Sequence, residues 1–534
     1  MKIEIYDTTL REGSQRSGVF FSEYEKAKVA GCLDILGIDY IEAGFFAPST
    51  ADSLCRFARK YGGSLKAGLS VLCATCRPGS EAGSDPVLRK LAESDFGTVA
   101  IVGKASLFQV STVLGTSPST NLDMIRSTVS FLKQAGKRVI FDAEHFFDGW
   151  SFDPGYTRSV LETAASAGAD RIVLCDTNGG MLPDVISITV ESVKKVTGGV
   201  PVGIHCHNDI GMADACSVAA VLAGASHVQC TVSGIGERCG NANLSTVVPT
   251  LQLKLGFECV PRECMEKLAP VTRDICQTAN LGFDECAPFV GGHSFLHKAG
   301  LHIDAVRKAP DSFEHIDPSL VGNRRSMIIS ELAGRSAISE LLGRMGYEAG
   351  KNSPELDRVA AAIRKAESEG YIFDSSEASL YVLINKTLGT QPRPFEMKDY
   401  KLIFSADEPA SSRWTAIVRF SVGGREQLRV GEGDGPVNAL DIAAHRALSG
   451  SFRKISGIKM SDIKARIDAN DSAASASTVR VFVETSDGNA VWRTMGASTD
   501  IIAASWAALL DAYEYFILHI CGPSGATKRP KEKS

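Results

Sequence analysis

Residues 202–232 read VGIHCHNDIGMADACSVAAVLAGASHVQCTV, and this stretch decides the fold. A short β-rich run, VGIH, is followed by a helical segment and then by a second β-rich run, HVQCTV. Short strands that alternate with helices are typical of a parallel sheet, because parallel strands need a long crossover between them. The stretch therefore predicts one strand–helix–strand unit.

Eight β-rich runs of this kind precede residue 261, and helical segments separate them. Eight such units in a domain of this size predict a TIM barrel, in which active sites lie at the C-terminal ends of the strands. The helix after the first run has its own start signal, since Ser22 and Glu25 form a capping box. The eight runs are KIEIYD, DYIEAG, KAGLSVL, TVAIVG, RVIFDA, RIVLCD, VGIH and HVQCTV.

Three further regions follow the predicted barrel of residues 1–261. Residues 262–397 are helical and polar and predict a mainly helical linker subdomain. Residues 398–520 predict an α+β domain with duplicated halves, because WTAIVRF and VGEGDGPVNALDIAAHRAL are echoed by TVRVFVE and TMGASTDIIAASWAALLDAY. Residues 521–534 are polar and basic and predict a flexible tail. We therefore expect an α/β chain with a TIM (β/α)8 barrel, a helical linker subdomain and a duplicated α+β domain.

The composition restricts the class of function. The 534 residues are 44% hydrophobic and 22% charged, which is close to the average of soluble globular proteins. A formal net charge of −5 gives no electrostatic attraction to nucleic acid or to an anionic membrane. The first predicted strand follows directly on the N-terminus, and the apolar run IIAASWAALL is too short to span a membrane. We therefore expect a cytoplasmic protein that binds small molecules.

Two histidines in the opening stretch, His205 and His207, are candidate metal ligands. Side chains alternate between the two faces of a strand, so these imidazoles point together while Cys206 points away. Two imidazoles at the C-terminal end of a barrel strand suit a divalent metal. A hydrogen-bonded histidine pair in a polar barrel mouth is an equally good interpretation of this segment alone.

Other predicted strand ends supply oxygen groups. Asp7 ends the first β-rich run, Arg11 and Glu12 follow in the next loop, and Asn241 lies in the glycine-rich SGIGERCGNANL after the eighth run. Aspartate, two histidines and asparagine would leave coordination positions open, and such a mixed nitrogen and oxygen set fits Mg, Mn, Zn or Co. A carboxylate and an adjacent carbonyl could chelate at the open positions, which would polarise a ketone.

These motifs resemble those of a known family, the TIM-barrel Claisen-condensing synthases, which include 2-isopropylmalate, homocitrate and citramalate synthases. FDAEHFFDG at 141–149 and LCDTNGG at 174–180 resemble the citramalate synthase branch. The resemblance covers the whole chain except the tail. The other matching motifs, in order along the chain, are DTTLREG at 7–13, HCHND at 205–209, GERCGNANL at 236–244, HKAGLH at 297–302, LVGN at 320–323, GRS at 334–336, GEGDGPVNALD at 431–441 and VWRTMG at 491–496.

The resemblance implies a role for each candidate residue. Arg11 would orient a 2-keto acid and stabilise negative charge on its oxygen, and Glu12 and Thr177 would also bind this substrate. Glu144 and His302 are the candidates for removing a methyl proton from acetyl-CoA, and the choice between them stays open. The implied metal ligands are Asp7, His205, His207 and Asn241.

The implied activity is that of an acyltransferase, which condenses acetyl-CoA with pyruvate and water to give (R)-citramalate and CoA, a step toward 2-oxobutyrate and isoleucine. The duplicated domain would be regulatory and would bind an end-product amino acid as effector. Family members are usually homodimers in which the linker region reaches the barrel of the partner, so His302 would act in that barrel.

Other functions stay open because two stretches depart from the citramalate synthase pattern. GFFAPSTAD at 44–52 and GKASLFQV at 103–110 lie near the expected pocket, and Glu12 replaces the commoner aspartate. Any of Phe45, Phe46, Leu107 and Phe108 could reshape that pocket, where one methylene changes selectivity by only about 1–3 kcal/mol.

The nearest alternative is therefore the same condensation on another 2-keto acid, as in 2-isopropylmalate or homocitrate synthases. A metal-dependent hydroxyacyl-CoA lyase and a non-catalytic amino-acid sensor are further alternatives. The duplicated domain argues against the lyase, because it suits a committed biosynthetic step. Intact metal and arginine positions argue against the sensor.

Overall fold

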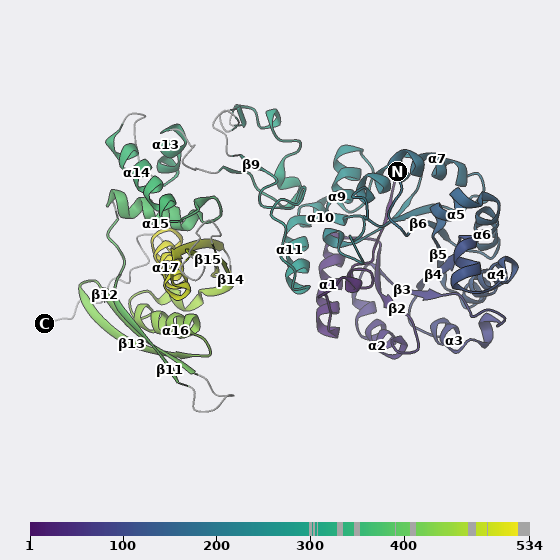
Figure 1. Cartoon of the computed structure of the whole chain (residues 1–534), viewed down its shortest axis with the longest axis horizontal. Coiled ribbons are helices and arrows are strands. Elements are labelled where there is room, and N and C mark those ends of the chain that lie inside the picture. Colours follow the sequence, from purple (N-terminus) through teal and green to yellow (C-terminus); the bar gives the residue numbers. More distant parts are fainter. Residues whose placement is uncertain are drawn as a thin grey trace. The chain divides into compact units, whose positions relative to one another are not determined.

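The computed structural model describes residues 1–297, 302, 305–306, 308–327, 335–345, 353–389, 391–405, 413–467, 477–488 and 490–521. These residues divide into two compact units, Met1–Leu296 with Pro310–Ser326, and His297–Ala309 with Met327–Ser534 (Figure 1). The domain boundaries expected at residues 261, 397 and 520 are finer than this division and stay a prediction.

The first unit contains the expected TIM barrel. Eight strands close into a barrel in sequence order, every neighbouring pair is parallel, and β1 pairs with both β2 and β8. All eight β-rich runs form these strands, so the expected architecture is confirmed. The strands are β1 Glu4–Asp7, β2 Tyr40–Phe45, β3 Gly68–Ala74, β4 Thr98–Lys104, β5 Arg138–Glu144, β6 Arg171–Asp176, β7 Val202–Cys206 and β8 His227–Cys230.

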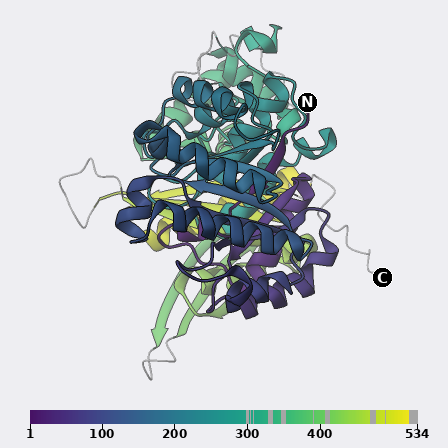
Figure 2. The same cartoon turned by 90° about the vertical axis from the view of Figure 1, so that its right-hand side faces the viewer.

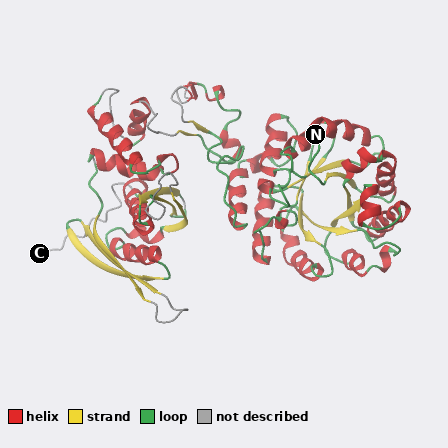
Figure 3. Cartoon of the chain, in the orientation of Figure 1, coloured by secondary structure: helices red, strands yellow, loops and turns green. Residues whose placement is uncertain are grey.

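Helices surround the barrel, as Figure 3 shows with red helices outside yellow strands. In the side view of Figure 2, the purple and blue helices of this unit cover the outside of the sheet. The expected capping box begins α1, where the Ser22 hydroxyl and the Glu25 carboxylate each accept a hydrogen bond from the other residue's backbone N–H. The helices are α1 Glu23–Leu36, α2 Ala51–Tyr61, α3 Pro86–Ala92, α4 Pro118–Gln134, α5 Phe146–Phe152, α6 Pro154–Ser166, α7 Pro183–Val193, α8 Ala213–Leu222, α9 Leu244–Pro249, α10 Arg262–Met265 and α11 Leu268–Thr278.

The barrel wall has an inner and an outer apolar face. Alternate side chains of each strand point into the barrel or toward the helices, as the two-residue period of a strand requires. A residue's place in its strand therefore decides which face it occupies. The outer face joins the main hydrophobic core, whereas the inner cluster consists of Tyr6, Tyr40, Leu72, Ala100, Ile140, Val173 and Cys175.

The N-terminal end of the barrel is closed by an ion-pair cluster around Glu4. Its carboxylate accepts hydrogen bonds from Arg171, at 3.0 and 2.8 Å, and from Arg138, at 3.0 Å. The Nδ1 atom of His227 lies 3.4 Å from the same carboxylate. Burial alone would raise the pKa of Glu4, but His227 and Arg171 outweigh it and lower this pKa to about 2.

The second unit contains part of the helical region expected at residues 262–397, together with the expected duplication, while residues 262–296 and 310–326 belong to the first unit. Each half of the duplication is a three-stranded antiparallel sheet followed by a helix, and the predicted repeat is confirmed. The halves are β11 Glu396–Ser405, β12 Arg413–Val422, β13 Arg425–Gly433 and α16 Pro436–Leu448, then β14 Lys459–Ile467, β15 Val479–Ser486, β16 Val491–Ser498 and α17 Ile501–Tyr515. The linker elements are β9 Leu296–His297, β10 Ser326–Met327, α13 Arg335–Arg344, α14 Pro354–Ser368 and α15 Glu377–Leu388.

One hydrophobic cluster joins the two halves of the duplication. Phe420 of β12 packs edge-on against Trp506 of α17, with ring centroids 6.2 Å apart. The Tyr513 hydroxyl on α17 donates a hydrogen bond to Asp441 on α16. Side chains of both sheets and both helices belong to this single cluster.

The apolar run in α17 is longer than the sequence indicated. Helix α17 continues through Phe516–Ile520, and the resulting stretch Ile501–Ile520 contains an 18-residue window of mean hydropathy 1.4, which by length and composition alone could cross a membrane. However, 56% of this window is buried, and Trp506, Leu509 and Tyr513 lie in the cluster that joins the two halves. The helix therefore packs as a core helix of this domain.

The cluster at the N-terminal end of the barrel predicts how stability depends on pH. A pKa lowered from 4.5 to about 2 corresponds to on the order of 3 kcal/mol of folding free energy. Because the folded-state pKa lies below the unfolded value, this contribution is fully present above about pH 4.5 and is lost as the pH falls toward 2. We therefore expect Glu4→Gln to lower the unfolding midpoint at pH 7 and to flatten its decline below pH 4.5.

Denaturant unfolding followed by circular dichroism would measure both effects. The matched control is Glu162→Gln, which removes an exposed ion pair with Arg158 at 2.8 Å and should cost less than about 1 kcal/mol. Equal unfolding midpoints for Glu4→Gln and the unmodified protein at pH 7 would show that the Glu4 cluster does not stabilise the fold.

Candidate active site at the mouth of the barrel

His205 and His207 lie side by side at the C-terminal end of β7. Their ring centroids are 5.2 Å apart, and each residue is 6% exposed. Cys206 between them belongs to the hydrophobic core outside the barrel. Strand alternation thus separates the sulfur from the imidazoles, as the sequence indicated.

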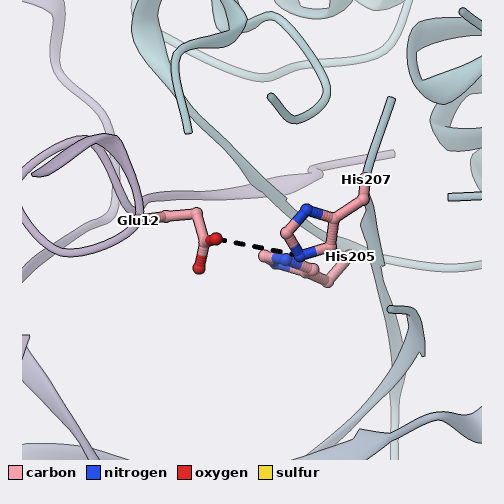
Figure 4. A group of neighbouring side chains, drawn as sticks. All are labelled: Glu12, His205 and His207. Carbon is pink, nitrogen blue, oxygen red and sulfur yellow. Dashed lines mark ion pairs between the residues drawn. The ribbon is translucent and has the colours of Figure 1, made fainter. Parts of the chain in front are cut away.

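The carboxylate beside these histidines is that of Glu12. Among the described residues, Glu12, His205 and His207 form a group whose ligand atoms all lie within 4.8 Å of one another. The Glu12 Oε1 atom is 3.8 Å from His207 Nε2. Figure 4 shows this carboxylate, carried by the loop after β1, pointing toward the rings of His205 and His207 at the end of β7.

Asp7, which the resemblance implied as a ligand, makes local contacts instead. Its two oxygens accept hydrogen bonds from the backbone N–H of Thr9, at 2.9 Å, and from the Thr9 hydroxyl, at 2.8 Å. Tyr6 belongs to the cluster inside the barrel, so alternation turns the next residue, Asp7, toward the outer face. Burial raises the pKa of Asp7 to about 7. The geometry therefore favours Glu12 over Asp7 as the carboxylate ligand.

Asn241 lies against His207 and offers an oxygen to the same group. The two residues form a backbone bridge, and Asn241 is 2% exposed. Its amide nitrogen donates weakly to the Ile235 carbonyl at 3.3 Å, while its Oδ1 has no hydrogen-bond partner among the described residues. A Cβ at Gly236 would lie 2.0 Å from the Asn241 side-chain amide, so a larger residue there would displace that amide.

These observations fit a divalent cation. A buried oxygen without a partner is costly, and a bound cation would satisfy that of Asn241. The Nδ1 atom of His207 also has no partner among the described residues. Burial lowers the pKa of His207 to about 4 and that of His205 well below its usual value, so both imidazoles are neutral at pH 7 and can act as ligands.

Arg11 places a fixed positive charge next to this group. Its Nε donates to Glu42 at 2.6 Å, and its guanidinium also pairs with Glu12. Glu42 is fully buried and accepts a second hydrogen bond from the Tyr6 hydroxyl at 3.0 Å. Burial opposes the charge of Arg11, but the negative charge of Glu42 outweighs it and raises the pKa of Arg11. The mouth of the barrel therefore holds a permanent cation suited to an oxyanion.

Thr177 and Glu144 lie at neighbouring strand ends. The Thr177 Oγ1 accepts a hydrogen bond from the His145 backbone N–H at 2.8 Å, so the hydroxyl proton can be donated to a ligand. Glu144 ends β5 and forms an ion pair with Lys104, its register partner at the end of β4. Their side chains are 26% and 21% exposed, so this pair borders the open mouth.

His302 belongs to the second unit, where it is exposed in a helical segment. The expectation that it acts at a barrel mouth therefore stays a prediction.

The sequence reasoning missed several residues that support the site. The Arg238 guanidinium donates twice to Asp209 and once to the Thr177 carbonyl, all at 2.8 Å, which ties together the loops after β6, β7 and β8. Lys104 was also missed, although it directly follows the fourth β-rich run. Gln229, which contacts His205 Nδ1, and its partner Asp142 were missed because the sequence alone does not show that these two strand residues meet inside the barrel.

The expected pocket residues divide into two groups. Phe46 is 1% exposed and packs edge-on against Phe96 in the main hydrophobic core, so it offers little surface to a ligand, and its expected part in the pocket stays a prediction. A register shift between Glu42 and Phe45 ends the simple alternation of β2, which the sequence did not show. Phe45 is 42% exposed and Phe108 is 59% exposed, so both remain candidates for contact with a ligand.

Family models of known proteins match the barrel, the linker region and the duplicated domain in turn. Residues 2–273 match the HMGL-like family model, residues 289–370 the homocitrate synthase post-HMGL domain-like model, and residues 374–517 the LeuA allosteric (dimerisation) domain model. An (R)-citramalate synthase of Aquifex aeolicus is 42% identical over 97% of this chain and 98% of its own length. One of Synechocystis sp. is 39% identical over 97% of both chains, and a probable 2-isopropylmalate synthase of Methanosarcina acetivorans is 30% identical over 96% of this chain and 95% of its own.

A closed eight-stranded barrel with a buried glutamate and two histidines at its mouth defines the class of metal-dependent TIM-barrel enzymes. The matches are more specific than this class, because they extend through the linker and the duplicated domain. The chain belongs to the HMGL-like family, in the group that contains the (R)-citramalate synthases.

Two substitutions separate the candidate carboxylate ligands. Glu12→Gln removes the anionic oxygens beside the histidines, so we expect the Kd for Zn²⁺ or Mn²⁺ to rise about 100-fold or more. Asp7→Asn should change it only several-fold, because Asp7 contacts Thr9 rather than the histidines. Competition with a chromogenic chelator would measure both constants.

Cys206→Ala is the control for changes in the same strand and should leave the metal stoichiometry unchanged. Loss of the metal in Asp7→Asn, together with its retention in Glu12→Gln, would reverse the assignment.

Proposed function

We propose that this protein condenses acetyl-CoA with pyruvate and water to give (R)-citramalate and CoA. The observation that carries the proposal is the buried group of Glu12, His205 and His207, which lies beside the Arg11 guanidinium and beside an Asn241 oxygen that no described residue hydrogen-bonds. The names of the relatives that are 36–42% identical over nearly the whole chain support pyruvate as the keto acid.

Glu12, His205, His207 and Asn241 would hold a divalent cation, which when bound would polarise the C2 carbonyl of the keto acid. The Arg11 guanidinium would bind the same carbonyl oxygen and stabilise the negative charge that develops on it. Mg²⁺, Mn²⁺, Zn²⁺ and Co²⁺ all suit this mixed donor set.

The residues at the neighbouring strand ends would position the substrates. The Thr177 hydroxyl would donate to the carboxylate of the keto acid, while Arg238 keeps its loop in place through the Thr177 carbonyl. Glu144 would remove a proton from the acetyl methyl group, and the resulting nucleophilic carbon would form the new bond to C2. Water would then cleave the thioester, which releases CoA and the free acid.

Glu144 is the better-supported base because it is fixed at the mouth of the barrel. Its ion pair with Lys104 holds the carboxylate at the C-terminal edge of the sheet, within the ring of strand ends that also carries the histidines. His302 stays the alternative base. It is the weaker candidate, because it lies in the linker region and would have to reach a barrel from there.

The remaining proposals concern the second unit and the cellular setting. The LeuA allosteric (dimerisation) domain match supports a homodimer with an amino-acid effector in the duplicated domain, and isoleucine suits a citramalate pathway. We place the enzyme in the cytoplasm, where acetyl-CoA and pyruvate are available.

Release of free CoA thiol from acetyl-CoA tests the reaction. We expect turnover with pyruvate to exceed that with 2-oxobutyrate, 2-oxoisovalerate and 2-oxoglutarate, and to disappear after thorough metal removal and return with added Mn²⁺. A preference for 2-oxoisovalerate would keep the mechanism and change the substrate. Turnover of pyruvate that survives removal of the metal would contradict the mechanism.

Exchange of the acetyl methyl protons with deuterium from solvent tests the base. We expect Glu144→Gln to lower this exchange about 100-fold or more, because the step needs a positioned base. His302→Asn should retain exchange if it serves only later steps. Mass spectrometry of recovered acetyl-CoA would measure the deuterium, with Glu162→Gln as the surface control. Normal exchange in Glu144→Gln with none in His302→Asn would assign the base to His302.

A further inference from the structure

We propose that Gln229 and Asp142 act as positioning residues, which fix the orientation and tautomer of His205 for metal binding. The proposal rests on the metal site of the proposed function. It adds two residues inside the barrel to the residues that would contact the metal directly.

Three buried side chains form a continuous hydrogen-bonded chain across the barrel interior. The Gln229 Oε1 atom lies 2.9 Å from His205 Nδ1, and the Gln229 Nε2 donates to Asp142 Oδ1 at 2.9 Å. Gln229 is the direct register partner of His205 on the neighbouring strand. Gln229 is 1% exposed and Asp142 is 4% exposed, so water does not replace these contacts.

The direction of the hydrogen bonds determines which histidine nitrogen carries the proton. Asp142 accepts from the Gln229 amide nitrogen, so the Gln229 carbonyl oxygen must face His205. That oxygen can only accept, and therefore His205 donates through Nδ1–H. The lone pair of a neutral His205 is then on Nε2, the remaining nitrogen that can bind a cation.

The two histidines are held in different ways. His207 is held through its backbone, which bridges to Asn241 and donates to the Asp176 carbonyl at 3.2 Å. The Nδ1 atom of His207 has no partner in the described part of the chain, whereas that of His205 contacts Gln229. A side chain, that of Gln229, therefore orients the His205 ring, whereas His207 is positioned mainly by its backbone.

A purely structural role explains this arrangement less well. Much of the barrel interior is filled by apolar and aromatic side chains, and buried amides and carboxylates are costly unless every polar atom is paired. An apolar side chain at position 229 would fill the space without needing Asp142. The polar pair is accounted for by the need to orient the imidazole.

Metal affinity of the full-length protein tests the proposal. Gln229→Met keeps the approximate side-chain length but removes both hydrogen bonds, so we expect the Kd for Zn²⁺ to rise about 10- to 100-fold. The visible spectrum of the Co²⁺-loaded protein should also change, because His205 would no longer be held in one orientation. Asp142→Ala should have a similar effect, and the double variant should lose less than the sum of the two single losses.

Two further variants separate orientation from a general loss of stability. Asp142→Asn keeps an oxygen that can accept from Gln229, so it should restore most of the affinity lost in Asp142→Ala. Gln252→Met removes a glutamine whose Oε1 accepts from the backbone N–H groups of Cys259 and Val260, both at 3.0 Å, and should leave metal affinity unchanged.

The possible outcomes distinguish this proposal from the proposed function. Unchanged affinity and an unchanged Co²⁺ spectrum in Gln229→Met and Asp142→Ala would overturn the positioning role alone. If the unmodified protein turns over acetyl-CoA and pyruvate without binding a divalent metal, both the metal site and the positioning role are wrong. An equal loss of affinity in Gln252→Met would assign the effect to stability and would also overturn the proposal.

Discussion

The alternation of side chains in a closed parallel barrel is the constraint on which the site depends. Every strand residue faces either the barrel interior or the helices. Because the barrel is closed, it has no edge strand whose side chains could face solvent instead. The rule places His205 and Gln229 inside the barrel and Cys206 outside it. It also brings charged groups from several strands to one mouth, because parallel strands all end at the same side.

The sequence predicted those parts of the structure that have a period. Eight β-rich runs define the barrel, and alternation within β7 separates His205 and His207 from Cys206. The same rule applied to β1 would have turned Asp7 outward, since Tyr6 faces inward, but sequence alone does not say which face is the interior. Glu12 follows the strand in a loop, where no period exists, so only the folded chain could show that it reaches the histidines.

Buried charges at the mouth of the barrel fix one another's positions. Arg11 is held between Glu42 and Glu12, and Glu42 is in turn fixed by the Tyr6 hydroxyl. Each buried charge in this set has a partner, which is the condition under which charges are tolerated away from water. The pairings of Arg11 and Tyr6 with Glu42 join residues more than 30 positions apart, and a single sequence contains no signal for them.

The hydrophobic cluster shared by the two halves of the duplicated domain couples the stability of one half to that of the other. Because Phe420 of the first half packs on Trp506 of the second, and Tyr513 bonds to Asp441, neither half possesses a complete core of its own. The halves must therefore fold and unfold as one cooperative unit. A ligand that changes the packing of one half would therefore change the packing of the other. Binding at one site in this domain would alter the affinity of a second site, even without direct contact between them.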